Sequence, residues 1–244
     1  MRLSAMSTLS LALLCAFGAA ARAEGATAPE ALAGVWQDGP AGIYFVQTPD
    51  FASGGLDRRT VLFAGDRWAE NPEGDLSQFN FDAARPSMSG RWSLAGDAMS
   101  MTPAEGPPRT GPVKLNPDTC FDFRDGIWCP ARPFAGATLA GKYSGGSSYS
   151  SSSSAIAVAS DYEFSADGTY RLLAAGSFTS AEPDGRVTAA GASEGRYRIE
   201  GLTLILTGSD GTERRDIAFP LGEGADGAAP PMIYFGGWLL TRQN

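Results

Sequence analysis

The chain repeats its own sequence pattern, with matching blocks in the same order in each half. Residues 89–101 match residues 194–206 at a constant offset of 105 positions, and residues 32–36 match residues 139–143. A third block, Phe121–Phe123 before a turn, has its match in the second half at positions 233–235. A duplication of this kind predicts two structural units with one fold. By itself it says nothing about activity.

The first 23 residues have the pattern of a signal peptide. Arg2 supplies a positive end, residues 9–21 are an apolar run too short to cross a bilayer, and residues 21–23 form a small-x-small cleavage site. We therefore expect the mature chain to start at Glu24. The protein should be exported by a bacterium, to the periplasm or the medium.

The mature chain divides into a lead-in and two repeats. Residues 24–31 are polar, the first repeat occupies residues 32–136, and the second occupies residues 139–244. No later apolar run approaches about 18 residues, so no membrane span is predicted. The 31 glycines and 16 prolines interrupt the sequence too often for long helices.

Short β-strands are the expected elements, and the second repeat shows them most clearly. Tyr162 and Phe164 alternate with polar residues, Asp167 and Gly168 turn the chain, and the alternation resumes at Tyr170. Such segments add up to seven or eight strands per repeat. We predict an all-β protein made of two tandem antiparallel β-barrels.

The tryptophans of the first repeat support this interpretation. Trp68 and Trp92 stand where Tyr170 and Tyr197 stand in the second repeat. Aromatic residues at matched positions are more typical of a core than of a ligand-stacking site. One segment breaks the strand pattern, because residues 144–154 are almost entirely serine and glycine. A lid over a barrel mouth is one interpretation, and an unconstrained loop is the favoured one.

Three cysteines occur in the precursor. Cys15 lies in the signal segment behind Leu14, which disfavours lipidation, so we expect it to be removed. Cys120 and Cys129 flank a predicted turn in an exported chain, which favours a structural disulfide over a redox or metal pair. The bond would stabilise the fold by about 2–3 kcal/mol, because the loop it closes is short.

Each repeat opens with a glycine two residues before an aromatic residue, at Trp36 and at Tyr143. This resembles the Gly-x-Trp that opens the first strand of lipocalins and other calycins, in which a late arginine packs over the ring. Arg132 and Arg242 follow the closing strands here, so the resemblance implies the cation–π pairs Trp36 with Arg132 and Tyr143 with Arg242. The segment from Trp238 also looks like the closing strand of avidin-type barrels. The resemblance implies a closed barrel with an apolar mouth and transfers no ligand-binding residue.

The residue types present exclude several chemistries. The chain has no histidine, which removes Ser-His-Asp catalysis and histidine-ligated zinc. Asp122 with Asp125, or Asp161 with Glu163, could serve as paired carboxylates for glycoside hydrolysis, but solvated turn and strand positions explain them better. No calcium, phosphate-loop or dinucleotide motif occurs. We predict no catalytic residue, no metal ligand and no cofactor, and hence no enzyme.

The net charge restricts the partners. Without Arg2 and Arg22 the mature chain has 17 basic and 27 acidic residues, a net charge of −10. This argues against binding to nucleic acid or to anionic lipid surfaces. Two hypotheses stay open. Hollow barrels would bind a small apolar or aromatic ligand, whereas filled barrels would form an envelope structural or protein-interaction module.

Overall fold

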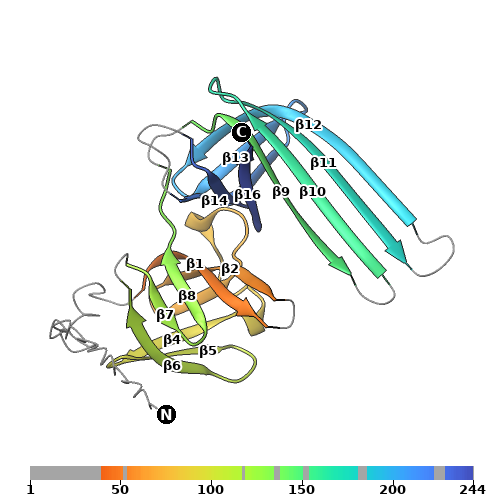
Figure 1. The fold of residues 1–244 in the computed structure, drawn as a ribbon. Coiled ribbons are helices and arrows are strands. Elements are labelled where there is room, and N and C mark those ends of the chain that lie inside the picture. The colour runs from red at the N-terminus through yellow and green to blue at the C-terminus, as the bar shows by residue number, and fades with distance from the viewer. Residues whose placement is uncertain are drawn as a thin grey trace, which may run out of the picture.

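Two closed eight-stranded antiparallel β-barrels follow each other along the chain, as the duplication predicts. The structure, a computed structural model, describes residues 40–51, 54–116, 119–134, 138–150, 154–180, 186–222 and 229–243. Figure 1 shows barrel 1, in orange to green, below barrel 2, in green to blue. The described part of the chain contains no α-helix, and therefore no helix long and apolar enough to cross a membrane.

Neighbouring strands in each barrel are also neighbours in sequence, and the first strand closes against the last. In barrel 1 the strands are β1 (Gly42–Asp50), β2 (Gly55–Ala64), β3 (Arg67–Glu70), β4 (Ser89–Ala95), β5 (Ala98–Pro103), β6 (Arg109–Leu115), β7 (Phe121–Phe123) and β8 (Gly126–Pro130). In barrel 2 they are β9 (Gly141–Ser150), β10 (Ser154–Phe164), β11 (Thr169–Ser180), β12 (Arg186–Glu200), β13 (Thr203–Gly208), β14 (Glu213–Leu221), β15 (Met232–Phe235) and β16 (Trp238–Gln243).

The strand register reproduces the sequence repeat. Trp68 pairs with Gly90 in barrel 1, and Tyr170 pairs with Gly195 in barrel 2. A Cβ on Gly90 would lie 2.0 Å from the carbonyl oxygen of Thr102, and one on Gly195 would lie 1.9 Å from that of Thr207. Only glycine lets the backbones approach this closely, which explains why the Gly-Arg-aromatic motif stands at both places.

The described first strands give Tyr143 a different counterpart from the one that the sequence pattern suggests. Gly42 pairs with Phe63 just as Gly141 pairs with Phe164, and both glycines have positive φ, 86° and 130°. Tyr44 therefore occupies the position of Tyr143. The predicted opening residue Trp36 lies outside the described residues.

Large apolar side chains fill the interior of both barrels. The core of barrel 1 contains Tyr44, Val46, Val61, Phe63, Trp68, Met99, Met101, Val113, Phe121, Phe123 and Trp128. The core of barrel 2 contains Phe134, Leu139, Tyr143, Tyr162, Phe164, Tyr170, Leu204, Leu206, Ala218, Ile233, Phe235 and Leu240. The matched aromatics belong to these cores as predicted, with Trp68 and Tyr170 buried and Trp92 and Tyr197 packed against them half-buried.

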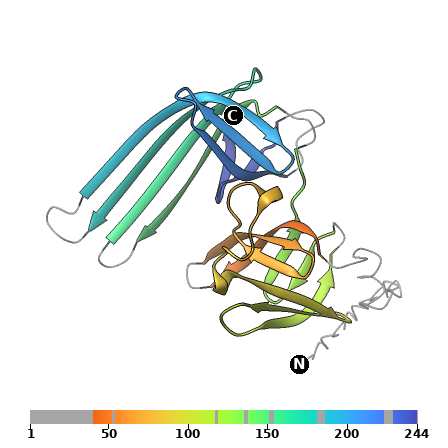
Figure 2. The same cartoon turned by 180° about the vertical axis from the view of Figure 1, so that it is seen from behind.

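A third apolar cluster joins the two barrels. It forms between the outer faces of β1 and β2 and those of β14 and β15, where Phe45 contacts Phe219 and Tyr234 at ring-centroid distances of 5.7 and 5.5 Å. The Tyr234 hydroxyl bonds the side chain of Thr60, which is buried there. The long β3–β4 connection, residues 71–88, adds Leu76, Phe79 and Phe81 to this cluster. Figure 2 shows this connection, in gold, lying between the barrels.

The serine- and glycine-rich segment is a strand, so the expectation of a loop is wrong for its described residues. Residues 144–150 of β9 pair in continuous register with residues 155–161 of β10. Backbone hydrogen bonding to a neighbouring long strand overrides the low strand propensity of glycine and serine. Together β9–β12 run past the barrel as a four-stranded extension, which Figures 1 and 2 show projecting to one side.

Candidate functional site

The filled interiors leave the barrel rims as the places where a ligand or partner would bind. Residues at the centre of each core are completely buried, including Trp68, Met99 and Met101 in barrel 1 and Tyr143 and Leu204 in barrel 2. The clefts found among the described residues instead lie on the surface. Three of them meet at one corner, Glu70–Glu73, where β3 ends and the long β3–β4 connection begins.

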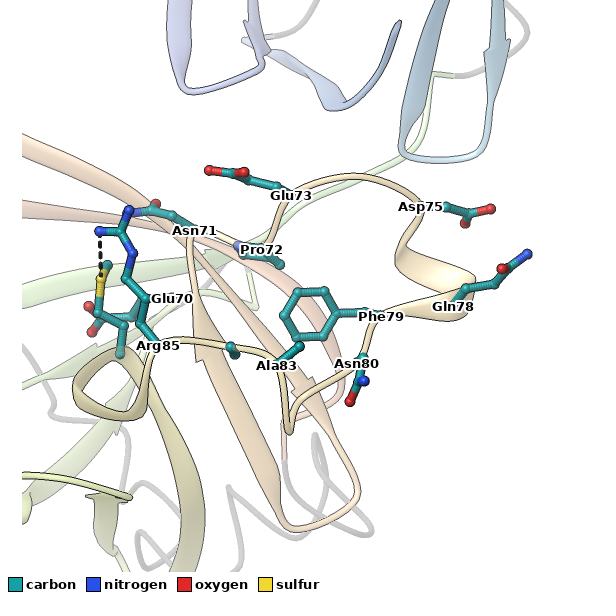
Figure 3. A pocket seen from close by; sticks show the side chains of 12 residues that line it. Glu70, Asn71, Pro72, Glu73, Asp75, Gln78, Phe79, Asn80, Ala83 and Arg85 are labelled. Atoms are coloured by element: carbon teal, nitrogen blue, oxygen red, sulfur yellow. Dashed lines mark hydrogen bonds between the residues drawn. The ribbon is translucent and has the colours of Figure 1, made fainter. Parts of the chain in front are cut away.

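The largest of these clefts, of about 590 Å³, lies inside the β3–β4 connection itself. Figure 3 shows Phe79 directed inward between Pro72 and Ala83, while the side chains of Glu73 and Asp75 extend away. The side chain of Asp75 forms its hydrogen bonds within the connection. Its carboxylate accepts hydrogen bonds from the backbone N–H (2.9 Å) and the hydroxyl (2.7 Å) of Ser77, and these bonds lower its pKa below 3.8. This cleft is a surface depression within the connection and not a preformed binding site.

A second cleft, of about 300 Å³, opens at the rim of barrel 1. We call it the rim cleft, and it is lined by Thr48, Arg59, Glu70, Met101, Arg109, Phe123, Arg124, Asp125, Gly126 and Trp128. Seven strands and the β7–β8 turn supply these residues, because residues near the ends of β1, β3, β5 and β7 and near the starts of β2, β6 and β8 meet at this end of the barrel.

Glu70 organises the arginines of the rim cleft. Its side chain is only 8% exposed and forms ion pairs with Arg109 and, at 3.7 Å, with Nε of Arg59. Arg109 also stacks over Trp68 at 5.3 Å from the ring centroid, a contact worth about 0.5–2 kcal/mol. The buried carboxylate is therefore compensated by two cations, as a carboxylate in this position must be.

Two polar atoms of the rim cleft are buried without a hydrogen-bond partner among the described residues. They are Oγ1 of Thr48 and Nε of Arg59. The strand register places Arg59 opposite Val46, two positions from Thr48 along the same strand face. An unpaired buried polar group costs about 1–3 kcal/mol, so two of them in one cleft are a feature to be explained.

The β7–β8 hairpin beside the rim cleft has a strained backbone at its turn and is cross-linked by a disulfide. Arg124 has a φ of 55°, the left-handed region that costs a non-glycine residue about 1–2 kcal/mol. The matching turn of barrel 2 has Gly236 with a φ of 54°. Cys120 and Cys129 form the predicted disulfide across this β7–β8 hairpin. Their counterparts in barrel 2, the paired Met232 and Thr241, form no such bond.

Barrel 2 has the matching arginine but no matching cleft among those found. Arg214 occupies the register position of Arg109, since Leu206 pairs with Arg214 as Met101 pairs with Arg109. Its Nε donates to Asp216 at 2.5 Å, and its guanidinium lies 5.2 Å from the ring centroid of Phe235. Burial raises the pKa of the nearby Tyr162, and the charge of Arg214 counteracts part of that rise.

The predicted aromatic–arginine pairs are only partly within the described residues. Tyr143 is buried and its hydroxyl donates to the carbonyl of Pro230 at 2.8 Å, while Arg242 is exposed directly opposite it in β16. Arg132 is exposed after β8, and its predicted partner Trp36 is not described. The cation–π contacts found in the described structure are those of Arg67, Arg109 and Arg214.

The carboxylate pairs do not form a recognisable catalytic arrangement. Asp125, Asp161 and Glu163 are exposed, and Asp122 accepts a hydrogen bond from the side chain of Asn116 at 2.8 Å. Among the described residues no group of three or more acidic or cysteine side chains could hold a metal ion.

The second prominent feature is the part of β9–β12 that runs beyond barrel 2. We call it the projecting sheet, made of residues 145–150, 154–161, 173–180 and 186–194. β12 pairs with β13 only from Gly195 to Glu200, and β9 pairs with β16 only from Lys142 to Ser144. Within the described strands, residues 145–150 of β9 and residues 186–193 of β12 have no strand partner on their outer edges. The sequence analysis did not identify this sheet, because its strands consist largely of alanine, glycine and serine, which give little contrast between the two faces.

Comparisons give no relative from which a function could be transferred. No protein-family model, no curated protein and no solved structure matches the chain.

Proposed function

We propose that this is an exported, non-enzymatic interaction protein that binds an extended polypeptide segment along an edge of the projecting sheet. The two filled barrels serve as its scaffold. The observation that carries the proposal is the length of β9–β12, whose strands continue past barrel 2 and leave two edges unpaired within the described strands.

An unpaired strand edge presents a row of backbone N–H and C=O groups that an incoming strand can satisfy. Natural proteins block such edges with proline, lysine or a covering loop. Residues 186–194 of β12 contain neither proline nor lysine, and arginine and glutamate stand only at the two ends of the segment. The edge is thus chemically open to strand addition.

The faces of the projecting sheet support the same conclusion. Antiparallel sheets ordinarily bury one face against a core. Here Ala159, Ala175, Ala190 and Ala192 are exposed, and Leu173 is 47% exposed among them. Small side chains allow a partner backbone to approach closely, and they bury too little apolar surface to stabilise the sheet strongly by themselves.

The comparison between the repeats shows that the extension is not needed for a closed barrel. In barrel 1 the corresponding first two strands are 9 and 10 residues long, and the third has only 4, against 10, 11 and 12 residues for β9, β10 and β11. Both barrels nevertheless close with eight strands. The extra length therefore serves something other than closure.

Site-specific photo-crosslinking tests the proposal. A photoreactive amino acid at position 190, on the β12 edge, is compared with one at position 166, an exposed alanine in the β10–β11 turn. We expect position 190 to give a discrete protein adduct in cells and position 166 to give none. Ala192→Lys, which places a charge on the edge, should abolish the adduct, whereas the control Ala166→Lys should not.

The partner identified in this way must then protect residues 186–194 of the purified protein from amide hydrogen exchange. Sedimentation of the purified protein shows whether the added strand comes from a second copy. Equal crosslinking at positions 190 and 166, or a partner that leaves the β12 edge unprotected, would contradict the proposal. The small apolar ligand of the other hypothesis finds no support in the filled cores, and the calycin resemblance stays a prediction.

A further inference from the structure

We propose that the rim cleft of barrel 1 binds a small monocarboxylate. The proposal does not rest on the projecting sheet, which belongs to the other barrel. It rests on the two unpartnered buried atoms, on the arginines and on the strained hairpin turn that line one cleft of about 300 Å³.

The unpartnered atoms specify what the ligand must offer. Nε of Arg59 can only donate a hydrogen bond, and the hydroxyl of Thr48 can donate one as well. Neither has an acceptor among the described residues, and the nearest carboxylate oxygen to Nε of Arg59, that of Glu70, is 3.7 Å away. A ligand oxygen that reaches either atom from the cleft would supply the acceptor that this atom lacks.

The ion pairs of the rim cleft leave one arginine available to a negatively charged ligand. Arg59, Arg109 and Arg124 line the cleft against two carboxylates, those of Glu70 and Asp125. Asp57 holds Nη1 of Arg59 from outside the lining, at 2.6 Å. Arg109 is paired with Glu70, whereas Arg124 forms no ion pair with any described residue. Arg124 is therefore the cation available to a bound anion.

The lining of the cleft fits a carboxylate attached to an apolar body. A guanidinium group presents a planar fork of donors that matches the two oxygens of a carboxylate. The floor of the cleft is apolar, formed by Met101, Phe123 and Trp128, which suits a short apolar or aromatic body attached to the carboxylate.

The strained turn supports a role for Arg124 in binding. Barrel 2 has Gly236 at this turn position with nearly the same φ, so barrel 1 carries an arginine where glycine would be unstrained. Residues held in this conformation concentrate at binding sites, where their side chains are needed. The Cys120–Cys129 disulfide fixes the hairpin that presents Arg124, which lowers the entropy cost of binding.

Titration of the full-length, disulfide-bonded protein with sodium benzoate tests the proposal. Nitrogen-15 NMR follows the Nε–H signal of Arg59 and the backbone signal of Gly126, which lies beside Thr48. We expect both signals to shift and saturate with benzoate, but not with benzyl alcohol, which has the same ring without the charge. Equal shifts with benzyl alcohol, or none with benzoate, overturn the proposal. Inorganic phosphate that binds as tightly as benzoate refutes the carboxylate class.

Thr48→Val separates binding from folding. The valine has nearly the shape of threonine but removes the unpartnered hydroxyl, so the melting temperature should stay the same or rise. The affinity for benzoate should nevertheless fall about tenfold, the equivalent of one lost hydrogen bond to a charged group. Arg124→Gly should weaken binding while relieving the strained turn. Arg91→Gln, at an exposed arginine paired with Asp66 elsewhere on barrel 1, is the control and should change neither. Unchanged affinity in both Thr48→Val and Arg124→Gly would refute the site.

Discussion

The close approach of the strands at Gly195 leads to a sharp prediction about a single methyl group. In Gly195→Ala the new Cβ would meet the carbonyl oxygen of Thr207 at 1.9 Å and the Cα of Gly208 at 2.9 Å. Both obstacles are backbone, so no side-chain rotation relieves them. Overpacking of this kind costs about 1–3 kcal/mol, and we expect the upper end because β12 and β13 must separate locally.

Gly191 in the same strand provides the matched control. A Cβ there meets no atom within 4 Å, and Gly191 does not have a positive φ. Gly191→Ala should therefore be neutral or stabilise by about 0.4–1 kcal/mol, since alanine restricts the unfolded chain. The two variants should differ by roughly 3 kcal/mol in the free energy of unfolding.

Urea unfolding followed by far-UV circular dichroism measures this difference. We expect the midpoint of Gly195→Ala to fall with an unchanged slope, because the exposed area does not change. For a barrel of about 100 residues a loss of 2–3 kcal/mol also lowers the melting temperature by roughly 8–24 °C. If Gly195→Ala were no less stable than Gly191→Ala, the close approach of β12 to β13 would be wrong, and with it the register on which the repeat equivalence depends.

Three further predictions concern the disulfide, the barrel contact and the pH dependence. Replacing Cys120 and Cys129 by alanine should destabilise barrel 1 by about 2–3 kcal/mol and leave hydrogen exchange in barrel 2 unchanged. Phe219→Ala should lower the calorimetric melting temperature of barrel 2, because it removes the ring that contacts Phe45 and Tyr234 between the barrels, whereas an unchanged melting temperature would refute that contact. Burial raises the pKa of Tyr143, Tyr162 and Tyr234 above 10.0. The folded state thus favours the neutral phenol, and its stabilisation is complete below pH 10 and lost as the pH rises through the folded-state pKa values. Absorbance at 295 nm should show these tyrosines ionising together with unfolding and not before it.

Much of the fold could be predicted from the sequence because the constraints are local. Strand alternation around Tyr162 and Tyr170, with turns at glycine between, defines hairpins whose partners are neighbours in sequence. A meander of such hairpins has few ways to bury its apolar face, and closure into a barrel is one of them. The matched blocks then required the second unit to repeat the first.

The parts that could not be predicted depend on contacts between distant residues or on weak patterns. The rim cleft brings Thr48 and Arg59 together with Arg109 and Arg124 from strands far apart in sequence. One sequence signal could have indicated the rim cleft. Arg109 and Arg214 are 105 positions apart, which is the offset of the repeat. The projecting sheet gave no signal, because a run of alanine, glycine and serine predicts a loop as readily as a strand.

The two repeats differ at their rims and agree in their centres, and this division indicates where their separate roles lie. The matched glycines Gly90 and Gly195 stand at the same close approach between neighbouring strands. The backbone N–H groups of Ala104 and Ser209, which are 105 positions apart, donate equivalent hydrogen bonds to the carbonyls of Ser89 and Glu194. At the rims, barrel 1 has short strands, a disulfide-clamped hairpin and a cleft with unpaired donors, whereas barrel 2 has four strands that continue outward. Since Arg59 and residues 186–194 share no contact among the described residues, substitutions at one rim should leave binding at the other unchanged. Two equivalent cores with different rims are the arrangement expected if the two barrels carry the two separate binding sites proposed above.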